Sequence, residues 1–488
     1  MSQVSLKKNV LLNLIRTFSS IVFPLITFPY IYRVLLPDNV GKIYFSLSVV
    51  SYFSLIATLG ITTYAVRECS AVRQNREDLS LVSSQIFSVN IITTLVSYLF
   101  LVITLFFYHE ISNYRTLILI QSIAIIATTI GADWLNVAME DFKYITLRTV
   151  IFQFVSLVLM FAFVHKPDDY IKFAFISLVS SSGSCFSNVL YRRRYCKVNF
   201  VFSINWKKHF FSIFYLFVML LAQTIFNSVD STMLGLMRGD FDVAIYSSAH
   251  KIMDVITQLI VSVAFVLIPR MSYYFSLNDY ENINRLSRKV FSFFCLIGLP
   301  CIFGATILAK EIILIVAGAE YIEATSVLQI LMISYLFNLF GGSFWGNILL
   351  LPAKREKFFM IVCCIAAVVN IFSNYFLIPT MGANGAAFTT GICNAMILVI
   401  LVLGRDRKVK LTKIGKMVIT PIIGCMGIYI VCLLFESIQN VFLRTILSIT
   451  LSSVLYFFIQ YIGKNELFGE IFEKACSVIH SSISKLRG

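Results

Sequence analysis

An arginine lies inside an apolar stretch of this sequence that is long enough to cross a bilayer. Arg16 falls within residues 9–36, close to Lys7 and Lys8. A charge inside such a stretch costs several kcal/mol unless it faces a partner or a water-filled cavity. Two interpretations stay open: a cavity-facing site for an anion, or a long side chain whose guanidinium reaches back to the lipid headgroups.

Four further ionisable side chains lie in apolar stretches: Asp133, Asp230, Lys251 and Asp254. Lys251 and Asp254 share one helical face, so they can neutralise each other. Asp230 is expected at a similar depth on the preceding helix. Two interpretations stay open for these three residues: a structural cluster that holds the helices together, or a role in transport. Two acids around one base leave a negative charge, which would suit a coupled proton or cation. Asp133 lies near the inner end of its helix and could reach the interface. The candidates for ion coupling are Asp230, Asp254 and Asp133.

Amide side chains are also frequent in the apolar stretches. Such groups commonly hydrogen-bond neighbouring helices and hold a bundle together. A subset that faces a cavity would suit a sugar, whose hydroxyl groups need donors and acceptors together. The sequence leaves both interpretations open for Asn90, Gln223, Asn227, Gln258, Gln329, Asn338, Asn347, Asn370, Asn374 and Asn394.

Residue patterns typical of enzymes are absent from the sequence. The five histidines are scattered and form no pair at metal-binding spacing. There is no glycine-rich phosphate loop and no nucleophile elbow. The eleven cysteines show no metal or redox spacing, and we expect no disulfide. These patterns predict a protein that is not an enzyme and that needs no metal and no cofactor.

The elements that position these side chains are membrane-spanning helices. The 488 residues are 58% hydrophobic and 13% charged, with a mean hydropathy of +0.84, which excludes a soluble globular protein. Runs of about 20 apolar residues, enough to cross a core about 30 Å thick, recur along the chain. We predict an all-α polytopic membrane protein with about fourteen transmembrane helices. The expected spans are residues 10–35, 43–66, 81–107, 115–138, 145–165, 170–190, 210–237, 243–268, 290–309, 325–350, 358–379, 383–403, 415–435 and 442–462.

The basic residues predict the orientation of these spans. Most of the 40 lysines and arginines fall in alternate breaks, most densely in residues 191–208 and 405–416. Because basic residues are retained on the cytoplasmic side, both termini are predicted to be cytoplasmic. The same placement explains the net charge of +15 without a nucleic-acid partner. The first apolar run is too long for a signal peptide, so we expect it to be retained.

Two features recur at nearly constant spacing. Trp134 and Trp345, and the basic runs that begin at Arg192 and Arg405, are separated by about 212 residues, which suggests two parallel six-helix repeats with a substrate site between them. We therefore expect an N-terminal six-helix lobe (1–190), a basic cytoplasmic linker (191–209) and a C-terminal six-helix lobe (210–404). Two additional transmembrane helices (405–463) and a cytoplasmic amphipathic tail (464–488) follow.

Four stretches resemble the polysaccharide-transport (Wzx-type) flippases, which export O-antigen and capsule repeat units. The first is residues 23–68, which begin FPLITFPYIYRVLLPDNVG. The others are GADWLNVAMEDFKYIT at 131–146, NSVDSTMLG at 227–235 and GANGAAFTT at 382–390. This family belongs to a superfamily that also contains multidrug exporters and the lipid II flippase.

The resemblance implies two six-helix lobes around a central cavity, with two extra helices outside. It further implies that an undecaprenyl-pyrophosphate-linked oligosaccharide moves from the cytoplasmic to the outer leaflet by alternating access. Basic residues that line the cavity would attract the pyrophosphate; Arg16 matches such a position, and Lys251 is the next candidate for substrate binding. The implied location is the bacterial inner membrane, and the implied partners are membrane lipids, a coupling cation, and the polysaccharide polymerase and chain-length machinery.

Two alternatives remain beside this function. A cation-coupled multidrug exporter of the same superfamily would need a tight acidic site in the first lobe, where only Asp133 lies within a span. A membrane polysaccharide polymerase is less favoured, because it would need a long outer loop with catalytic residues, and the expected outer breaks are short.

Overall fold

The computed structural model describes residues 6–203, 206–412, 414–470 and 472–474. The side chains of residues 6–17, 206–212, 215, 216, 219, 263, 265 and 416 lie outside the described part. The described residues form helices and the turns between them. The chain divides into two compact units, Met1–Ser247 and Ser248–Gly488.

Unit 1 is built from eight α-helices, three short 3₁₀ segments and the start of a ninth helix. They are α1 (Leu6–Thr58), α2 (Ile61–Ala71), α3 (Arg76–Phe107), η1 (His109–Tyr114), α4 (Arg115–Gly131), α5 (Trp134–Ala138), α6 (Phe142–Phe163), η2 (Pro167–Asp169), α7 (Tyr170–Tyr191), η3 (Arg192–Arg194), α8 (Trp206–Met237) and the first residues of α9 (Asp240–Phe265).

Unit 2 contains the rest of α9 and the remaining helices, two of which include a π-helical segment, η4 and η6. The elements are α10 (Ile268–Ser276), α11 (Tyr280–Phe293), η4 (Phe294–Gly298), α12 (Leu299–Ile307), α13 (Ala309–Val316), η5 (Ala319–Tyr321), α14 (Ala324–Asn338), η6 (Leu339–Leu350), α15 (Glu356–Met381), α16 (Ala383–Leu403), α17 (Ile414–Leu434) and α18 (Val441–Ile462).

The helices confirm the all-α polytopic fold. Within the described residues, eleven helices are long and apolar enough to cross a membrane, and one of them, Phe18–Ala71, includes the second expected span and most of the first. The expected spans 210–237 and 243–268 coincide with α8 and α9, which include side chains outside the described part. Each of the other expected spans also coincides with a helix or with consecutive helical segments.

Helix α1 covers the first expected span and most of the second, and it leaves helical geometry at one residue. Leu36 has φ 63° and ψ 165°. The next residue is Pro37, which lacks an N–H and disfavours a helical conformation at the residue before it. Pro24 and Pro29 lie inside the continuous helix. The break between the first two spans is therefore a bend at Leu36.

Polar side chains cap the N-terminal ends of three helices. Asn75 accepts hydrogen bonds from the N–H groups of the first turn of α3 at 3.0 and 3.4 Å. Asp141 does the same for α6 at 3.1 Å, and Asp279 for α11 at 3.1 Å. Such caps satisfy N–H groups that have no partner within the helix, so they fix where each span begins.

The basic linker packs along α3 in unit 1. Ser80 Oγ donates to the backbone oxygen of Lys197 at 2.5 Å, and the N–H of Val201 donates to Ser88 Oγ at 2.8 Å. The two units meet in sequence at Ser247, inside α9, whereas we expected a division at residues 191–209. The expected lobe boundaries stay a prediction, and most of the expected tail helix lies outside the described residues.

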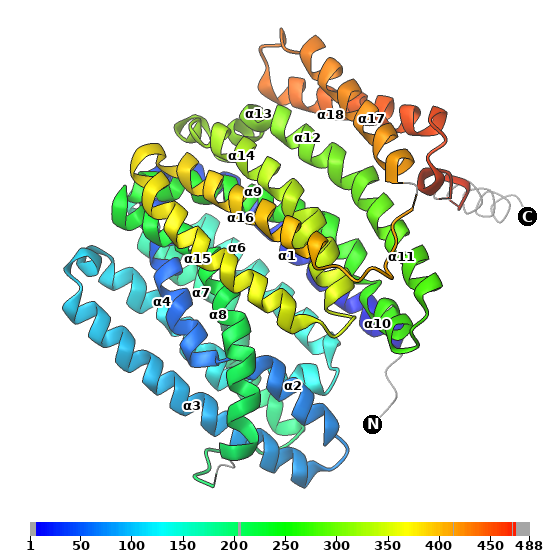
Figure 1. Cartoon of the computed structure of the whole chain (residues 1–488). Coiled ribbons are helices and arrows are strands. Elements are labelled where there is room, and N and C mark those ends of the chain that lie inside the picture. The colour runs from blue at the N-terminus through cyan, green and yellow to red at the C-terminus, as the bar shows by residue number, and fades with distance from the viewer. Residues whose placement is uncertain (1–5, 204–205, 413, 471, 475–488) are drawn as a thin grey trace, which may run out of the picture. The chain divides into compact units, whose positions relative to one another are not determined.

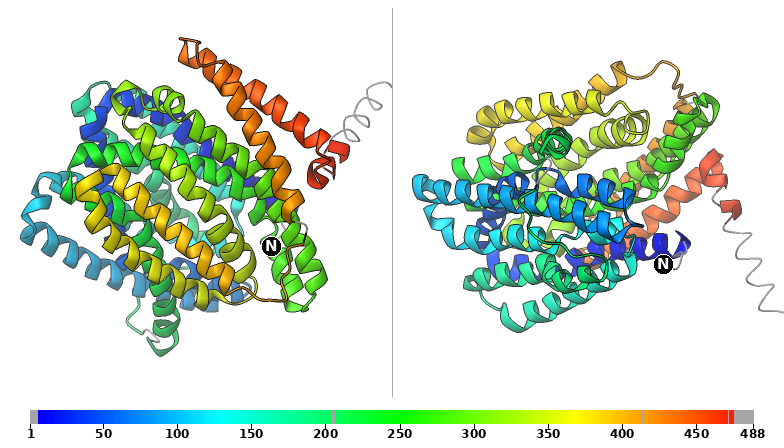
Figure 2. Two further views of the ribbon diagram at one scale, coloured as in Figure 1. Left: turned by 45° about the horizontal axis from the view of Figure 1, so that its top comes forward. Right: turned by 90° about the horizontal axis from the view of Figure 1, so that it is seen from below.

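The last two spans form a hairpin in unit 2. Helices α17 and α18 lie side by side and pack against α12 and α13 (Figure 1). The left view of Figure 2 shows the two helices meeting at a turn. This arrangement fits the expectation that residues 405–463 are added to a six-helix core.

Candidate functional site

Asp133 forms a two-point ion pair with an arginine on the next span. Arg148 Nη1 donates to Oδ1 at 3.2 Å, and Nη2 donates to Oδ2 at 2.7 Å. Arg148 is only 5% exposed, and its guanidinium lies 5.1 Å from the centre of the Tyr144 ring. The sequence analysis did not single out Arg148, which lies near the start of the expected span 145–165, and it missed this pair. The pair gives Asp133 a structural role, and its role in ion coupling stays a prediction.

A second carboxylate lies at the start of α6 in unit 1. Asp141 accepts hydrogen bonds from the hydroxyls of Tyr191 and Tyr195 at 2.7 and 2.6 Å. Burial alone would raise the pKa of Asp141, but the hydrogen bonds from Tyr195, Tyr191 and the N–H of Tyr144 outweigh it, so the pKa lies below its ordinary value. This carboxylate therefore stays ionised and ties α6 to the linker at neutral pH.

Asp230 is buried in unit 1, where α8 packs on α1. It is 2% exposed and accepts a hydrogen bond from the Tyr246 hydroxyl at 2.6 Å. On the side of α8 that faces α1, hydroxyl groups pair across the helices. Ser51 Oγ donates to Ser228 Oγ at 2.9 Å, and Thr232 Oγ1 donates to Ser48 Oγ at 2.9 Å. Gly41 lets α1 approach the start of α9 closely, because a Cβ there would lie 1.9 Å from the backbone oxygen of Asp240.

Lys251 and Asp254 pair on one face of α9, as their spacing predicts. Lys251 Nζ lies 3.5 Å from Asp254 Oδ2, and His250 Nδ1 lies 3.4 Å from the same oxygen. The sequence analysis missed the histidine, although it lies one turn from Asp254. Asp230 belongs to unit 1 and this pair to unit 2, so the expected cluster of all three residues stays a prediction.

Arg16 lies in the first part of α1. Its side chain is outside the described residues. The two interpretations of this arginine, an anion site in a cavity and a guanidinium at the headgroups, both stay predictions.

The structure separates the amides into two groups. Six hydrogen-bond to described neighbours, for example Asn90 to the oxygen of Ala57 at 2.9 Å and Asn338 to Asn394 at 3.2 Å. The amides that join helices in this way are Asn90, Gln329, Asn338 and Asn394, whereas Asn374 donates to Asn370 within α15 at 3.2 Å. Among the described residues, four of the amides have no hydrogen-bond partner: Gln223, Asn227, Gln258 and Asn347.

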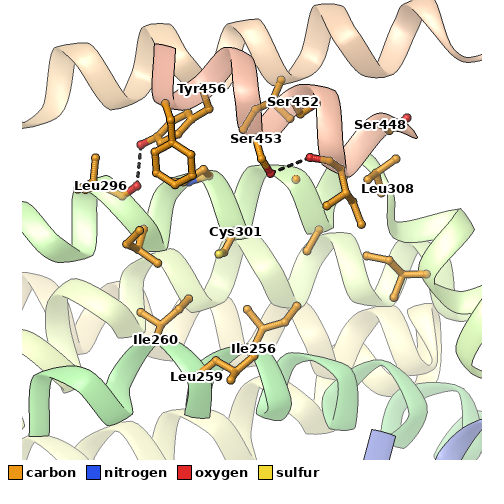
Figure 3. Close-up of a pocket in the computed structure, with 18 residues that line it drawn as sticks. Ile256, Leu259, Ile260, Leu296, Cys301, Leu308, Ser448, Ser452, Ser453 and Tyr456 are labelled. Carbon is orange, nitrogen blue, oxygen red and sulfur yellow. Dashed lines mark hydrogen bonds between the residues drawn. The ribbon is translucent and has the colours of Figure 1, made fainter. Parts of the chain in front are cut away.

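An apolar pocket lies in unit 2 between the hairpin and the core helices. It has a volume of about 390 Å³ and is lined by α9, η4, α12, α13, α17 and α18. Figure 3 shows Ile256 and Ile260 on one side and Cys301 on another. The labelled hydroxyl side chains, Ser452 among them, all come from α18 (Figure 3). A pocket of this composition suits a hydrocarbon chain better than a sugar or an ion.

Polar contacts fasten the hairpin on both sides of this pocket. The Tyr456 hydroxyl donates to the oxygen of Leu296 at 2.7 Å (Figure 3). Arg444 Nη2 lies 3.0 Å from Glu311 Oε1, and Glu311 is only 4% exposed. The sequence analysis did not single out Arg444, which lies at the start of the expected span 442–462, and did not foresee its buried partner on α13. These contacts hold α18 against the core while leaving the apolar space between them.

The long apolar helices and their buried ion pairs define a multi-pass α-helical membrane protein. The chain belongs to the polysaccharide biosynthesis protein family, whose model matches residues 6–275. A second family model, MatE, matches residues 216–376.

Three relatives match over most of their length. A "Putative O-antigen transporter" of Escherichia coli (strain K12) is 22% identical over 80% of this chain and 94% of its own. A protein of the same description from Shigella dysenteriae is 22% identical over 81% of this chain and 99% of its own. "Capsular polysaccharide biosynthesis protein CapF" of Staphylococcus aureus is 22% identical over 74% of this chain and 90% of its own.

Two solved structures share the fold. The lipid II flippase MurJ, in an inward closed conformation, matches with a TM-score of 0.75 and 15% identity, over 94% of this chain and 99% of its own. A multidrug resistance MATE family transporter in an inward-facing conformation matches with a TM-score of 0.62 and 16% identity, over 80% of this chain and 94% of its own. At these identities the likeness shows the fold alone.

Proposed function

We propose that this protein is a flippase that moves an undecaprenyl-pyrophosphate-linked oligosaccharide, an O-antigen or capsule repeat unit, from the cytoplasmic to the outer leaflet. The family match over residues 6–275 carries this proposal. The relatives described as O-antigen transporters support it, because they align with most of the chain. The protein acts in the bacterial inner membrane by alternating access, with both termini in the cytoplasm.

The three parts of such a substrate need three kinds of surface. The apolar pocket beside α18 suits a segment of the polyprenyl chain, since its walls are aliphatic and aromatic. Arg16 and Lys251 are proposed to attract the pyrophosphate, because fixed positive charge stabilises a phosphate in a low dielectric. Amides that face away from the helix bundle offer donors and acceptors to the sugars.

A coupling ion is the proposed source of energy for transport. Asp230, Asp254 and Asp133 are the proposed coupling residues, as carboxylates within or beside spans. The family match and the absence of enzyme motifs in the sequence support a transporter that performs no covalent chemistry.

A deletion strain tests the proposed function. Without the protein, surface polysaccharide should be lost while complete lipid-linked repeat units accumulate on the inner leaflet. Both are measured together, by polysaccharide staining and by extraction of lipid-linked oligosaccharides. Reintroducing the gene should restore polymer and clear the accumulated units. Polymer that persists in the deletion strain would contradict the proposal.

The second candidate function is a cation-coupled multidrug exporter. The match of the MatE model to residues 216–376 favours it. On this alternative, the same deletion strain would keep its surface polysaccharide and become more sensitive to lipophilic cationic drugs. A drug panel on the deletion strain therefore separates the two functions.

A further inference from the structure

Two unpartnered amides lie one turn apart on α8. Gln223 and Asn227 are four residues apart, so they share a helical face. Both side chains are exposed, and neither hydrogen-bonds to any described residue. This distinguishes them from amides such as Asn90, which is buried and donates to the oxygen of Ala57.

The two amides lie near the middle of the membrane. At 1.5 Å per residue, Asn227 lies about 15 Å and Gln223 about 21 Å from the Met237 end of α8. The hydrocarbon core is about 30 Å thick, so both fall close to its midplane. Helix α8 has 32 residues and extends well beyond the core on the other side.

Exposure of this face of α8 to lipid does not explain why two amides lie on it. An amide without a partner in hydrocarbon costs several kcal/mol. The packing surface of α8 on α1 is already occupied by Ser228 and Thr232, which pair with Ser51 and Ser48. The amides lie on a different sector of the helix, where both side chains are exposed, whereas Asp230, one turn beyond Asn227 on that sector, is buried against Tyr246. A polar, uncovered sector at mid-depth is expected where a transport pathway passes.

We propose that Gln223 and Asn227 bind hydroxyl groups of the oligosaccharide that this protein carries. The inference rests on the proposed flippase function and assigns the sugar-recognising part of the site. Each amide offers a carbonyl acceptor and two N–H donors, which match the mixed donor and acceptor character of sugar hydroxyls. Side chains four residues apart on a helix are about 6 Å from one another, so both can contact one sugar or two neighbouring sugars.

This assignment separates recognition of the sugar from recognition of the carrier. The pyrophosphate is assigned to Arg16 and Lys251, and the two amides are assigned to the sugar. The amides determine how strongly the sugar-bearing lipid is preferred over the bare carrier.

The test compares two probes on the purified full-length protein in nanodiscs. One probe is undecaprenyl pyrophosphate, and the other is the same lipid bearing the repeat unit, extracted from the deletion strain. The wild-type protein should bind the sugar-bearing lipid about tenfold more tightly, as expected for two added neutral hydrogen bonds. In the double variant Gln223→Leu/Asn227→Leu this preference should disappear, while the affinity for undecaprenyl pyrophosphate stays unchanged.

Two control variants make the result specific. Asn227→Gln keeps an amide and should retain part of the preference, whereas Leu236→Ala changes an exposed apolar residue of the same helix and should leave both affinities unaltered. Thermal melting of each purified variant checks that the fold is intact. A double leucine variant that folds and still prefers the sugar-bearing lipid would overturn the inference. Failure of the wild-type protein to bind either probe would instead contradict the proposed function, and the inference with it.

Discussion

The charges inside the spans of this protein differ in what surrounds them. Asp133 is held by both terminal nitrogens of Arg148, while Asp254 lies between His250 and Lys251 on its own helix. A two-point pair with a buried arginine is directional and rigid. The two contacts at Asp254 are longer, at 3.4 and 3.5 Å. The carboxylate on α9 is therefore held less rigidly than the Asp133 carboxylate.

Replacement of Arg148 by methionine should destabilise the protein. It leaves the Asp133 carboxylate without its partner, and breaking a buried pair in this way costs about 3–5 kcal/mol. Because the Asp133 side chain is 39% exposed, we expect a value at the lower end. The double variant Asp133→Asn/Arg148→Met should recover most of the loss, since no charge is then left alone. Unfolding of the wild type, the two single variants Asp133→Asn and Arg148→Met, and the double variant in one detergent measures the coupling free energy of the pair. Equal stability of the wild type and Arg148→Met would show that the pair contributes nothing.

The chemical types of the site residues could be predicted from the sequence, but their partners could not. Hydropathy placed Asp133 in or near a span because its neighbours are apolar. Its partner Arg148 looked like a boundary residue, because a single arginine at the start of an apolar run usually marks the interface. In the same way, nothing in the sequence around Gln223 indicates that it lacks a hydrogen-bond partner among the described residues while Asn90 has one. Tertiary packing decides which amide finds a partner, and that packing depends on residues far away in the sequence.

At the scale of helices, the expected spans were accurate because hydrophobicity and membrane crossing have the same cause. What hydropathy misses is helical structure that is polar or distorted. Helix α11 begins at Tyr280, ten residues before the expected span, and continues through the π-helical segment η4. A break between α4 and α5 occurs at Ala132, where the positive φ of 49° falls on the alanine and not on the neighbouring Gly131. Such features are set by packing rather than by composition.

Filling the pocket beside the hairpin should weaken binding of the lipid carrier. A Cβ placed on Gly304 of α12 meets no atom within 4 Å, so a larger side chain can grow into the pocket without a clash near the backbone. In Gly304→Phe the ring would displace a hydrocarbon chain, and the affinity for undecaprenyl pyrophosphate should fall about tenfold, equivalent to about 1.4 kcal/mol. Binding to the purified protein in nanodiscs measures this.

Gly304→Ala provides the matched control for that variant. It leaves the pocket almost unfilled and should stabilise the helix by up to about 1 kcal/mol, because alanine has the higher helix propensity. Its affinity for the lipid should equal that of the wild type. If the phenylalanine variant also binds like the wild type, the polyprenyl chain lies elsewhere.

For the whole molecule, the direction of transport depends on which ends of the helices face the cytoplasm. The linker beyond α7 is rich in basic residues, with Arg193, Arg194 and Lys197 exposed. The break between α8 and α9 contains one arginine, which is paired with Asp242 at 3.1 Å. Retention of basic residues on the inner side therefore predicts that the linker is cytoplasmic. The Met237 end of α8 would then face outward, so a substrate taken up from the inner leaflet would pass Gln223 before Asn227.

Reporter fusions should confirm this orientation. A fluorescent protein fused after residue 203 or at the C-terminus should be fluorescent, because it folds in the cytoplasm. Alkaline phosphatase fused after Gly239 or Gly318 should be active, because it needs the oxidising outer side. Activity of the phosphatase after residue 203 would reverse the predicted orientation. The linker would then face outward, and the Met237 end of α8 would be the entrance to the pathway rather than its exit, so the proposed direction of transport depends on this result.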